Sequence, residues 1–433
     1  MKNEKNLVIA RNILVPFILI TTCFALWGFA NDITNPMVKT FSKIFRMSAT
    51  GGTLVQVAFY GGYFTMAFPA AMFIRKFNYK AGILVGLGLY ATGALLFIPA
   101  NMSGIFAPFL IAYFILTCGL SFLETSANPY ILSMGSEETA TRRLNFAQAF
   151  NPMGSLLGMW VAMNFIQAQL DPRDTNTRNL LSQEEFEAVK VHDLDILSNP
   201  YIIIGLIIVA MFIIIALVKM PKNEDSNHKV HLFLTLRRLS SNKRYREGVI
   251  AQFFYVGAQI MCWTFIIHYG TRIFISQGMA EKDAEVLSQQ YNIIAMIIFC
   301  VSRFICTFIL KYIKPGKLLM FLAIGGMTLT LGTIFIQGVA GLYFLVGISA
   351  CMSLMFPTIY GISLKGLGED AKIGAAGLIM AILGGSVLPP LQASIINFET
   401  LFTMPAVNVS FIVPLISFII ITIFGYRTQR SMK

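Results

Sequence analysis

The stretch IFAPFLIAYFILTCGLSFLETSANPYIL, residues 105–132, contains a single charged side chain, that of Glu124. As an α-helix, a run of about 20 apolar residues is long enough to cross a hydrocarbon layer about 30 Å thick. A charged carboxylate at bilayer depth costs at least about 2.5 to 3.5 kcal/mol on insertion scales, so such residues are rare and mark ion, proton or substrate paths. The segment therefore predicts a membrane-spanning helix that carries a functional acid.

Apolar stretches of this length recur along the whole chain. Hydrophobic residues make up 56% of the sequence and charged residues 12%, against about 25% charged in a typical soluble domain. The mean hydropathy is +0.69. We predict an all-α membrane protein, and no β-barrel, because barrel strands alternate polar and apolar residues. It has twelve transmembrane helices, at residues 14–36, 52–74, 80–99, 105–132, 144–166, 201–219, 248–271, 289–310, 317–336, 340–363, 373–395 and 407–426.

The basic residues are distributed unevenly between the two sides of the predicted membrane. With a cytoplasmic N-terminus, 24 of the 33 Lys and Arg residues fall in cytoplasmic segments, eight fall outside, and Arg303 lies in a span. This asymmetry follows the positive-inside rule and places both termini in the cytoplasm. The net charge of +12 thus indicates anionic lipid headgroups as a partner and not nucleic acid. We expect no cleavable signal peptide, because the start MKNEKN is polar and charged.

A polar, basic loop at residues 220–246 divides the chain into two six-helix halves, 1–219 and 247–433. Spans four and ten both carry a Pro, then a Gly followed by acids, then a base. This internal similarity predicts two pseudo-symmetric six-helix bundles, with a substrate site at mid-membrane between the halves. The polar residues 171–200, outside the membrane, are expected to carry a short amphipathic helix.

Two acids lie in predicted spans. Desolvation of Glu124 disfavours its charged form, so that this side chain can take up a proton on one side and release it on the other. The alternative is a carboxylate that pairs with a buried base or caps a helix broken at Pro129. In span one, Asp32 and Asn35 are three residues apart, on one helix face, with Asn31 beside them. This group either lines a cavity that binds hydroxyls and a proton, or is a helix end solvated from outside.

Span five carries Asn145, Gln148 and Asn151 at helical spacing. Such an amide stripe must face protein or water, because lipid offers no hydrogen bonds. Amides donate and accept, which suits a polyhydroxylated ligand. The alternative is interhelical hydrogen bonding, with Gly154 and Gly158 allowing close helix packing.

Other polar and aromatic side chains recur at helical spacing: Gln252, Tyr255, Gln259 and Trp263 in span seven, and Gln56, Tyr60 and Tyr63 in span two. Aromatic faces can cover the C–H surface of a sugar ring while amides bind its hydroxyls. The alternative reading is packing, or anchoring at the membrane interface.

Arg303 lies near the cytoplasmic end of span eight, and we expect a structural or gating role for it. The sequence contains no H-E-x-x-H, G-x-S-x-G or P-loop pattern, and its four histidines fall in loops or at a span end, where they form no cluster suited to a buried metal. We therefore expect neither an enzyme nor an ATP-driven pump, and neither a metal site nor a cofactor. Coupling is expected to come from an ion gradient.

At these positions the chain resembles the fucose permease family of sugar–proton symporters, within the major facilitator superfamily. The resemblance covers nearly the whole length. The segments that carry it are AFYGGYF at 58–64, FLETSANPY at 122–130, RLNFAQAFNPMGSLLG at 143–158, AQFFYVGAQIMCW at 251–263 and FPTIYGISLKGLGEDAK at 356–372.

The resemblance implies the major facilitator fold, alternating access, and import of one sugar with one proton. The family's span-four acid falls on Glu124 and its span-five amides on Gln148 and Asn151. Asn128 and Gln56 join the expected substrate-binding set.

In one respect the chain departs from the family. Better-known members have the span-one acid where this chain has Asn35, and an Asn where this chain has Asp32. Either the exchange preserves the site's chemistry, or Glu124 is the only essential proton carrier. We expect L-fucose as substrate, with galactose, glucose or N-acetylglucosamine as alternatives, and a non-translocating sugar sensor as a more distant one. The expected setting is the bacterial inner membrane, and the expected working form a monomer.

Overall fold

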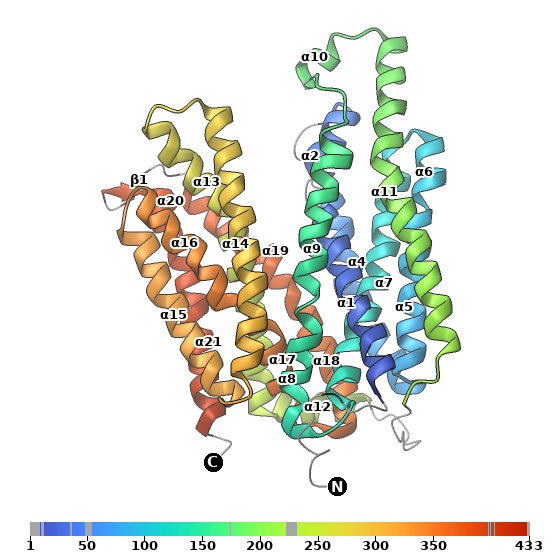
Figure 1. The fold of residues 1–433 in the computed structure, drawn as a ribbon, viewed down its shortest axis with the longest axis vertical. Coiled ribbons are helices and arrows are strands. Elements are labelled where there is room, and N and C mark those ends of the chain that lie inside the picture. The colour runs from blue at the N-terminus through green and yellow to red at the C-terminus, as the bar shows by residue number, and fades with distance from the viewer. Residues whose placement is uncertain are drawn as a thin grey trace. The chain divides into compact units, whose positions relative to one another are not determined.

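The computed structural model describes residues 9, 13–34, 37–47, 54–173, 175–221, 232–396, 398, 400–401 and 403–430. These residues are almost entirely helical (Figure 1). Contacts divide the chain into two compact units. One comprises Ala10–Ile131 and Phe150–Asn227, and the other comprises Met1–Ile9, Leu132–Ala149 and His228–Lys433.

The unit that contains the N-terminal helix is built from long helices with short helices at their ends. Its elements are α1 (Leu14–Thr34), α2 (Met37–Ile44), α4 (Leu54–Lys76), α5 (Tyr79–Leu95), α6 (Phe97–Ser103), α7 (Phe106–Ser133, whose last residues belong to the other unit), α9 (Asn151–Val161), the π-helix η2 (Ala162–Gln167), α10 (Thr175–Asn179) and α11 (Gln183–Leu217).

The other unit contains the C-terminal helices together with α8. Its elements are α8 (Glu137–Gln148), α12 (Leu232–Ser241), α13 (Lys243–Ser276), α14 (Glu281–Ile309), α15 (Pro315–Phe335), α16 (Val339–Met352), α17 (Met355–Leu364), η3 (Gly368–Asp370), α18 (Ala371–Met380), η4 (Ala381–Leu383), α19 (Gly384–Ile396), the antiparallel pair β1 (Thr400–Leu401) and β2 (Met404–Pro405), α20 (Ala406–Val409) and α21 (Ile412–Arg430).

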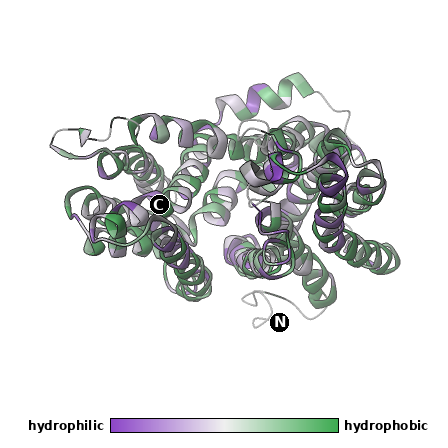
Figure 2. Ribbon diagram, turned by 90° about the horizontal axis from the view of Figure 1, so that it is seen from above, coloured by the Kyte–Doolittle hydropathy of each residue, from purple (hydrophilic) through white to green (hydrophobic). Residues whose placement is uncertain are grey.

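Eleven helical segments of the described residues are long and apolar enough to cross a membrane. Figure 2 shows that hydrophobic residues dominate the helices of both units. The all-α, multi-pass membrane architecture expected from the sequence is therefore confirmed.

The predicted helix at 144–166 is not continuous, which corrects the sequence-based expectation. The structure divides it into α8, α9 and η2, with a break after Gln148. Pro152 lies in the first turn of α9. Proline has no N–H and its ring clashes with the carbonyl four residues earlier, so the hydrogen-bond ladder stops at the Gln148 carbonyl. The polar stretch 171–200 contains the short helix α10, and from Gln183 onward it forms the first part of α11.

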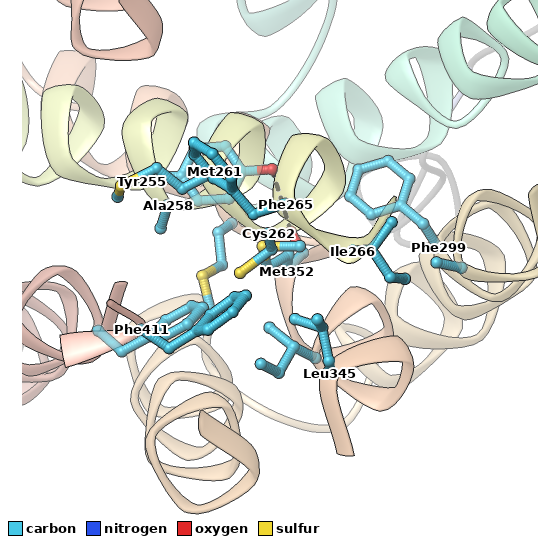
Figure 3. Packing of buried hydrophobic residues seen from close by; sticks show 14 of the residues in the cluster. Tyr255, Ala258, Met261, Cys262, Phe265, Ile266, Phe299, Leu345, Met352 and Phe411 are labelled. Carbon is cyan, nitrogen blue, oxygen red and sulfur yellow. Dashed lines mark hydrogen bonds between the residues drawn. The ribbon is translucent and has the colours of Figure 1, made fainter. Parts of the chain in front are cut away.

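A large apolar core holds the C-terminal unit together. Figure 3 shows Met261, Cys262, Phe265 and Ile266 of α13 packed with residues of neighbouring helices. The hydroxyl of Tyr255 donates to the Met352 carbonyl over 3.2 Å, which ties α13 to the end of α16.

Candidate proton and substrate site

Glu124 lies in the most deeply buried part of α7. Every residue from Leu116 to Ile131 of this helix is buried, and Glu124 itself is 5% exposed. A helix that is apolar and buried on all sides belongs to the interior of a bundle. The helix continues through Pro129, so Glu124 does not cap a broken helix.

The hydroxyl of Tyr63 on α4 is the polar partner of this acid. It lies 3.0 Å from Oε1 of Glu124 and 3.3 Å from Oδ1 of Asn31 on α1. No Lys, Arg or His forms an ion pair with Glu124 among the residues that the structure describes. Glu124 is therefore a buried acid that faces a hydroxyl and not a counter-charge.

Close packing fixes α4 against α7 at this level. The Ser121 hydroxyl donates to the Tyr63 carbonyl over 3.0 Å. A Cβ added to Gly62 would lie 2.8 Å from the Phe114 carbonyl oxygen, so only glycine allows this approach. The position of the Tyr63 ring relative to Glu124 thus follows from backbone contacts on both sides of it.

Asp32 is half-buried on α1 and acts electrostatically on the Tyr60 hydroxyl. Tyr60 lies one turn before Tyr63 on α4, so Asp32 and Glu124 interact with neighbouring tyrosine hydroxyls of the same helix. Asn35 lies outside the described residues, as does the side chain of Gln56.

Asn128, expected among the substrate residues, is fully buried. Its amide nitrogen donates to the Glu124 carbonyl over 2.9 Å. This bond is local to α7 and holds the helix at the level of the acid. It indicates a structural role for the amide nitrogen of Asn128.

The three amides predicted to form one stripe are distributed over two helices and two units. In the C-terminal unit, the Asn145 amide nitrogen donates to the Thr358 hydroxyl over 3.1 Å, and Gln148 ends α8. In the N-terminal unit, Asn151 begins α9 and donates to the Phe24 carbonyl over 3.1 Å. Asn145 and Asn151 therefore make interhelical hydrogen bonds, which was the alternative reading.

Arg303 is 3% exposed and makes contacts from α14 to two broken helices. Its Nη1 donates to the Gln148 carbonyl over 3.0 Å, and its Nε donates to the Ser353 carbonyl over 2.5 Å. Pro152 and Pro357 stand four residues after these two carbonyls. Since proline cannot donate to the carbonyl four residues before it, both carbonyls lack their helical partner and the guanidinium supplies a donor to each.

An aromatic path leads from Arg303 to a predicted substrate residue. The guanidinium lies over the Phe299 ring, 4.5 Å from its centroid. Trp263 meets the same ring edge-on with centroids 4.9 Å apart, and its Nε1 donates to the Ser349 hydroxyl over 3.2 Å. Phe299 and Ser349 could not be predicted from the sequence, because a Phe or a Ser in an apolar span carries no distinguishing signal.

The two glutamines of α13 differ in environment. Gln259 is half-buried, and it has no hydrogen-bond partner among the described residues, so its amide is available to a ligand. Gln252 is fully buried, and neither its amide nitrogen nor its amide oxygen has a hydrogen-bond partner among the described residues. Tyr255 lies between them and is buried; its hydroxyl donates to the Met352 carbonyl and interacts electrostatically with Arg303.

Comparison with known proteins places these features in a family. The sequence model described as Major Facilitator Superfamily matches residues 19–390. The chain is 53% identical to an L-fucose-proton symporter of Haemophilus influenzae, over 98% of this chain and 99% of the relative. It is 33% identical to the L-fucose-proton symporter of Escherichia coli, over 98% and 95% of the two chains.

A Brucella abortus glucose/galactose transporter is 30% identical, over 95% of this chain and 93% of the relative. Among solved structures, the crystal structure of the major facilitator transporter FucP in the outward conformation superposes with a TM-score of 0.87. It is 32% identical and the match covers 96% of this chain and 99% of that chain.

Proposed function

The chain belongs to the major facilitator superfamily, and on that premise we propose that it imports L-fucose together with a proton. The two relatives named as L-fucose-proton symporters match over nearly their whole lengths. The chain is thus a secondary transporter that uses a sugar and a proton. The observation that supports proton coupling is the environment of Glu124, a buried acid that faces a hydroxyl and, among the described residues, no basic side chain.

Glu124 is the proton carrier in this proposal, with Asp32 as a second acid near the same helix. A carboxylate withdrawn from water favours its neutral form, so proton uptake compensates for burial. Protonation from outside neutralises the site and lowers the cost of closing it around the sugar. The loaded carrier then reorients, and the lower proton activity of the cytoplasm releases proton and sugar there.

We propose that the sugar is bound by side chains that combine exposure with hydrogen-bonding capacity. Gln259 offers an amide with no partner among the described residues, and Trp263 offers an indole face beside it on the same helix. Asn31 and Tyr60 are half-buried near the acids. By resemblance the set extends to Asn35, Gln56, Asn128, Gln148 and Asn151.

Arg303 is a gating residue in this proposal. It joins the end of α8 to the break between α16 and α17. Hydrogen bonds from a charged guanidinium to carbonyl oxygens are at least as strong as those from an uncharged donor. The Phe299 ring lies between Arg303 and Trp263. A sugar that moves the Trp263 ring would therefore displace the surface on which Arg303 rests, and so loosen its bond to Gln148.

The multi-pass fold places the protein in a membrane, and we assign it to the bacterial inner membrane with both termini in the cytoplasm. The distribution of Lys and Arg supports this orientation. The chain works as a monomer in this proposal, since each chain contains both halves of the fold.

A second candidate substrate is glucose or galactose. A relative named as a glucose/galactose transporter matches 95% of the chain, and the exchange of Asp32 and Asn35 alters the acid geometry of span one. Competition by unlabelled sugars against labelled L-fucose distinguishes the two substrates, because the preferred sugar displaces the label at the lower concentration.

The deciding experiment is uptake of radiolabelled L-fucose into proteoliposomes with and without an inward proton gradient. Accumulation that needs the gradient and is abolished by a protonophore is the expected result. A folded preparation that takes up no L-fucose under either condition overturns the substrate assignment. Equal uptake with and without the proton gradient overturns the proposed proton coupling.

A further inference from the structure

The hydroxyl of Tyr63 stands between the proposed proton carrier and a proposed sugar ligand. It lies 3.0 Å from Oε1 of Glu124 and 3.3 Å from Oδ1 of Asn31. Tyr63 is 4% exposed and Glu124 5%, whereas Asn31 is half-buried and can reach a ligand. The three side chains come from α4, α7 and α1 of one compact unit.

A phenol carries one proton, so it can donate to only one of these two neighbours at a time. When Glu124 is ionised, its carboxylate only accepts, and Tyr63 donates to it. The hydroxyl oxygen can then only accept from Asn31, which must present its amide nitrogen. When Glu124 is protonated, its O–H donates to Tyr63, and the Tyr63 proton turns to Oδ1 of Asn31.

Building on the proposed function, we propose that Tyr63 is a positioning residue that converts the protonation state of Glu124 into the orientation of the Asn31 amide. A half-turn about the Cβ–Cγ bond exchanges the amide oxygen and nitrogen, and this terminal torsion is soft. With Glu124 protonated, Asn31 presents its nitrogen as a donor toward the sugar. With Glu124 ionised, Asn31 presents its oxygen instead. The Tyr63 O–H bond stays intact throughout, and the only proton gained or lost is that of Glu124.

Other ionisable groups surround this triad and need to be separated from it. Tyr60 on α4 and Tyr90 on α5 act electrostatically on Tyr63, and the Tyr90 hydroxyl is held by the Leu26 carbonyl at 3.0 Å. Asp32 on α1 acts on Tyr60. Of these groups, Asp32 is a second acid that can make sugar binding depend on pH, so the test includes Asp32→Asn.

The test is the Kd of L-fucose, measured by calorimetry on the purified full chain across the pH range in which Glu124 titrates. Gain or loss of one hydrogen bond changes Kd by up to about tenfold across that range in the parent protein. Tyr63→Phe removes the hydroxyl and is expected to reduce this pH dependence to less than about twofold, also in the Asp32→Asn background. Equal weakening at every pH, with the full pH dependence retained, would show a merely structural role and overturn the proposal.

A second measurement does not depend on the folding of Tyr63→Phe or on sugar binding. Infrared difference spectra of the parent protein without sugar follow the Glu124 carboxyl band and the amide carbonyl bands together, with Glu124→Gln and Asn31→Ala to assign them. An Asn31 band that shifts as Glu124 titrates supports the relay. A carboxyl band that titrates while no Asn31 band moves overturns it. If L-fucose does not bind at all, the substrate assignment fails while this spectrum still decides the relay.

Discussion

Replacing Glu124 with Gln separates sugar movement from proton coupling. Gln has the same shape and cannot ionise, so it imitates the protonated acid. Its amide group can still form a hydrogen bond with the Tyr63 hydroxyl, which lies 3.0 Å from the present carboxylate oxygen. Because Glu124 has no cationic partner among the described residues, the variant leaves no buried charge unpaired.

The magnitudes follow from these contacts. Removing one member of a buried ion pair costs about 3–5 kcal/mol, a cost that does not arise here. The hydrogen bond to a charged group, about 1.5–3 kcal/mol, becomes one of about 0.5–1.5 kcal/mol, and the desolvation cost of the charge disappears. We expect a change in the free energy of unfolding below about 2 kcal/mol. With one proton carried per sugar, each pH unit of gradient supports about tenfold accumulation, equivalent to about 1.36 kcal/mol.

The assay uses proteoliposomes under two conditions. In counterflow, with sugar on both sides and no gradient, Glu124→Gln is expected to exchange L-fucose. With an inward proton gradient it is expected to equilibrate the sugar without accumulating it, while the parent protein accumulates about tenfold per pH unit.

Glu137→Gln is the matched control, because Glu137 is an exposed acid in the first turn of α8 and should behave as the parent protein. Full gradient-driven accumulation by Glu124→Gln would refute the assignment of Glu124 as proton carrier.

Three other substitutions test the packing, the gate and an external charge cluster. Arg303→Leu leaves the Gln148 carbonyl without its donor, and we expect uptake to fall at least tenfold while equilibrium L-fucose binding changes less; parallel loss of both would contradict a gating role. Gly154→Ala places a Cβ 2.7 Å from the Ala25 carbonyl carbon, so α1 and α9 must separate, at a cost of about 1–3 kcal/mol. We expect a lower melting temperature than that of the control Gly88→Ala, whose Cβ makes only ordinary van der Waals contacts. The Arg173 guanidinium lowers the pKa of Asp171 to about 2. The stability from this carboxylate is therefore present above its unfolded pKa of about 3.9 and is lost as the pH falls toward 2, so that Asp171→Asn should lower the melting temperature at neutral pH and progressively less in acid.

The membrane fold could be predicted from the sequence, because hydropathy and segment length are local properties. A run of apolar residues about 30 Å long has few alternatives to a spanning helix, since lipid leaves no other partner for its backbone. The sequence predicted Glu124 as a candidate for the same reason, because one acid in an apolar segment is costly wherever the segment packs. The family motifs around it added the expectation of sugar and proton as substrates.

The positions of the helix breaks and the pairing of the polar groups could not be predicted from the sequence. Pro152 was visible in the sequence, but its effect needed Arg303, a residue 151 positions away, to take up the Gln148 carbonyl. The amide stripe of span five was wrong as a single surface for the same reason, because the break places Asn145 and Asn151 on different helices.

Tertiary structure also decided what each polar side chain does. Helical spacing put Tyr60 and Tyr63 on one face of a span, but only packing against α1 and α7 brings the Tyr63 hydroxyl to both Asn31 and Glu124. The physical reason is the range of the interactions. Burial in lipid depends on the residues of one segment, whereas a hydrogen bond depends on the approach of two segments to within about 3 Å, which no single segment encodes.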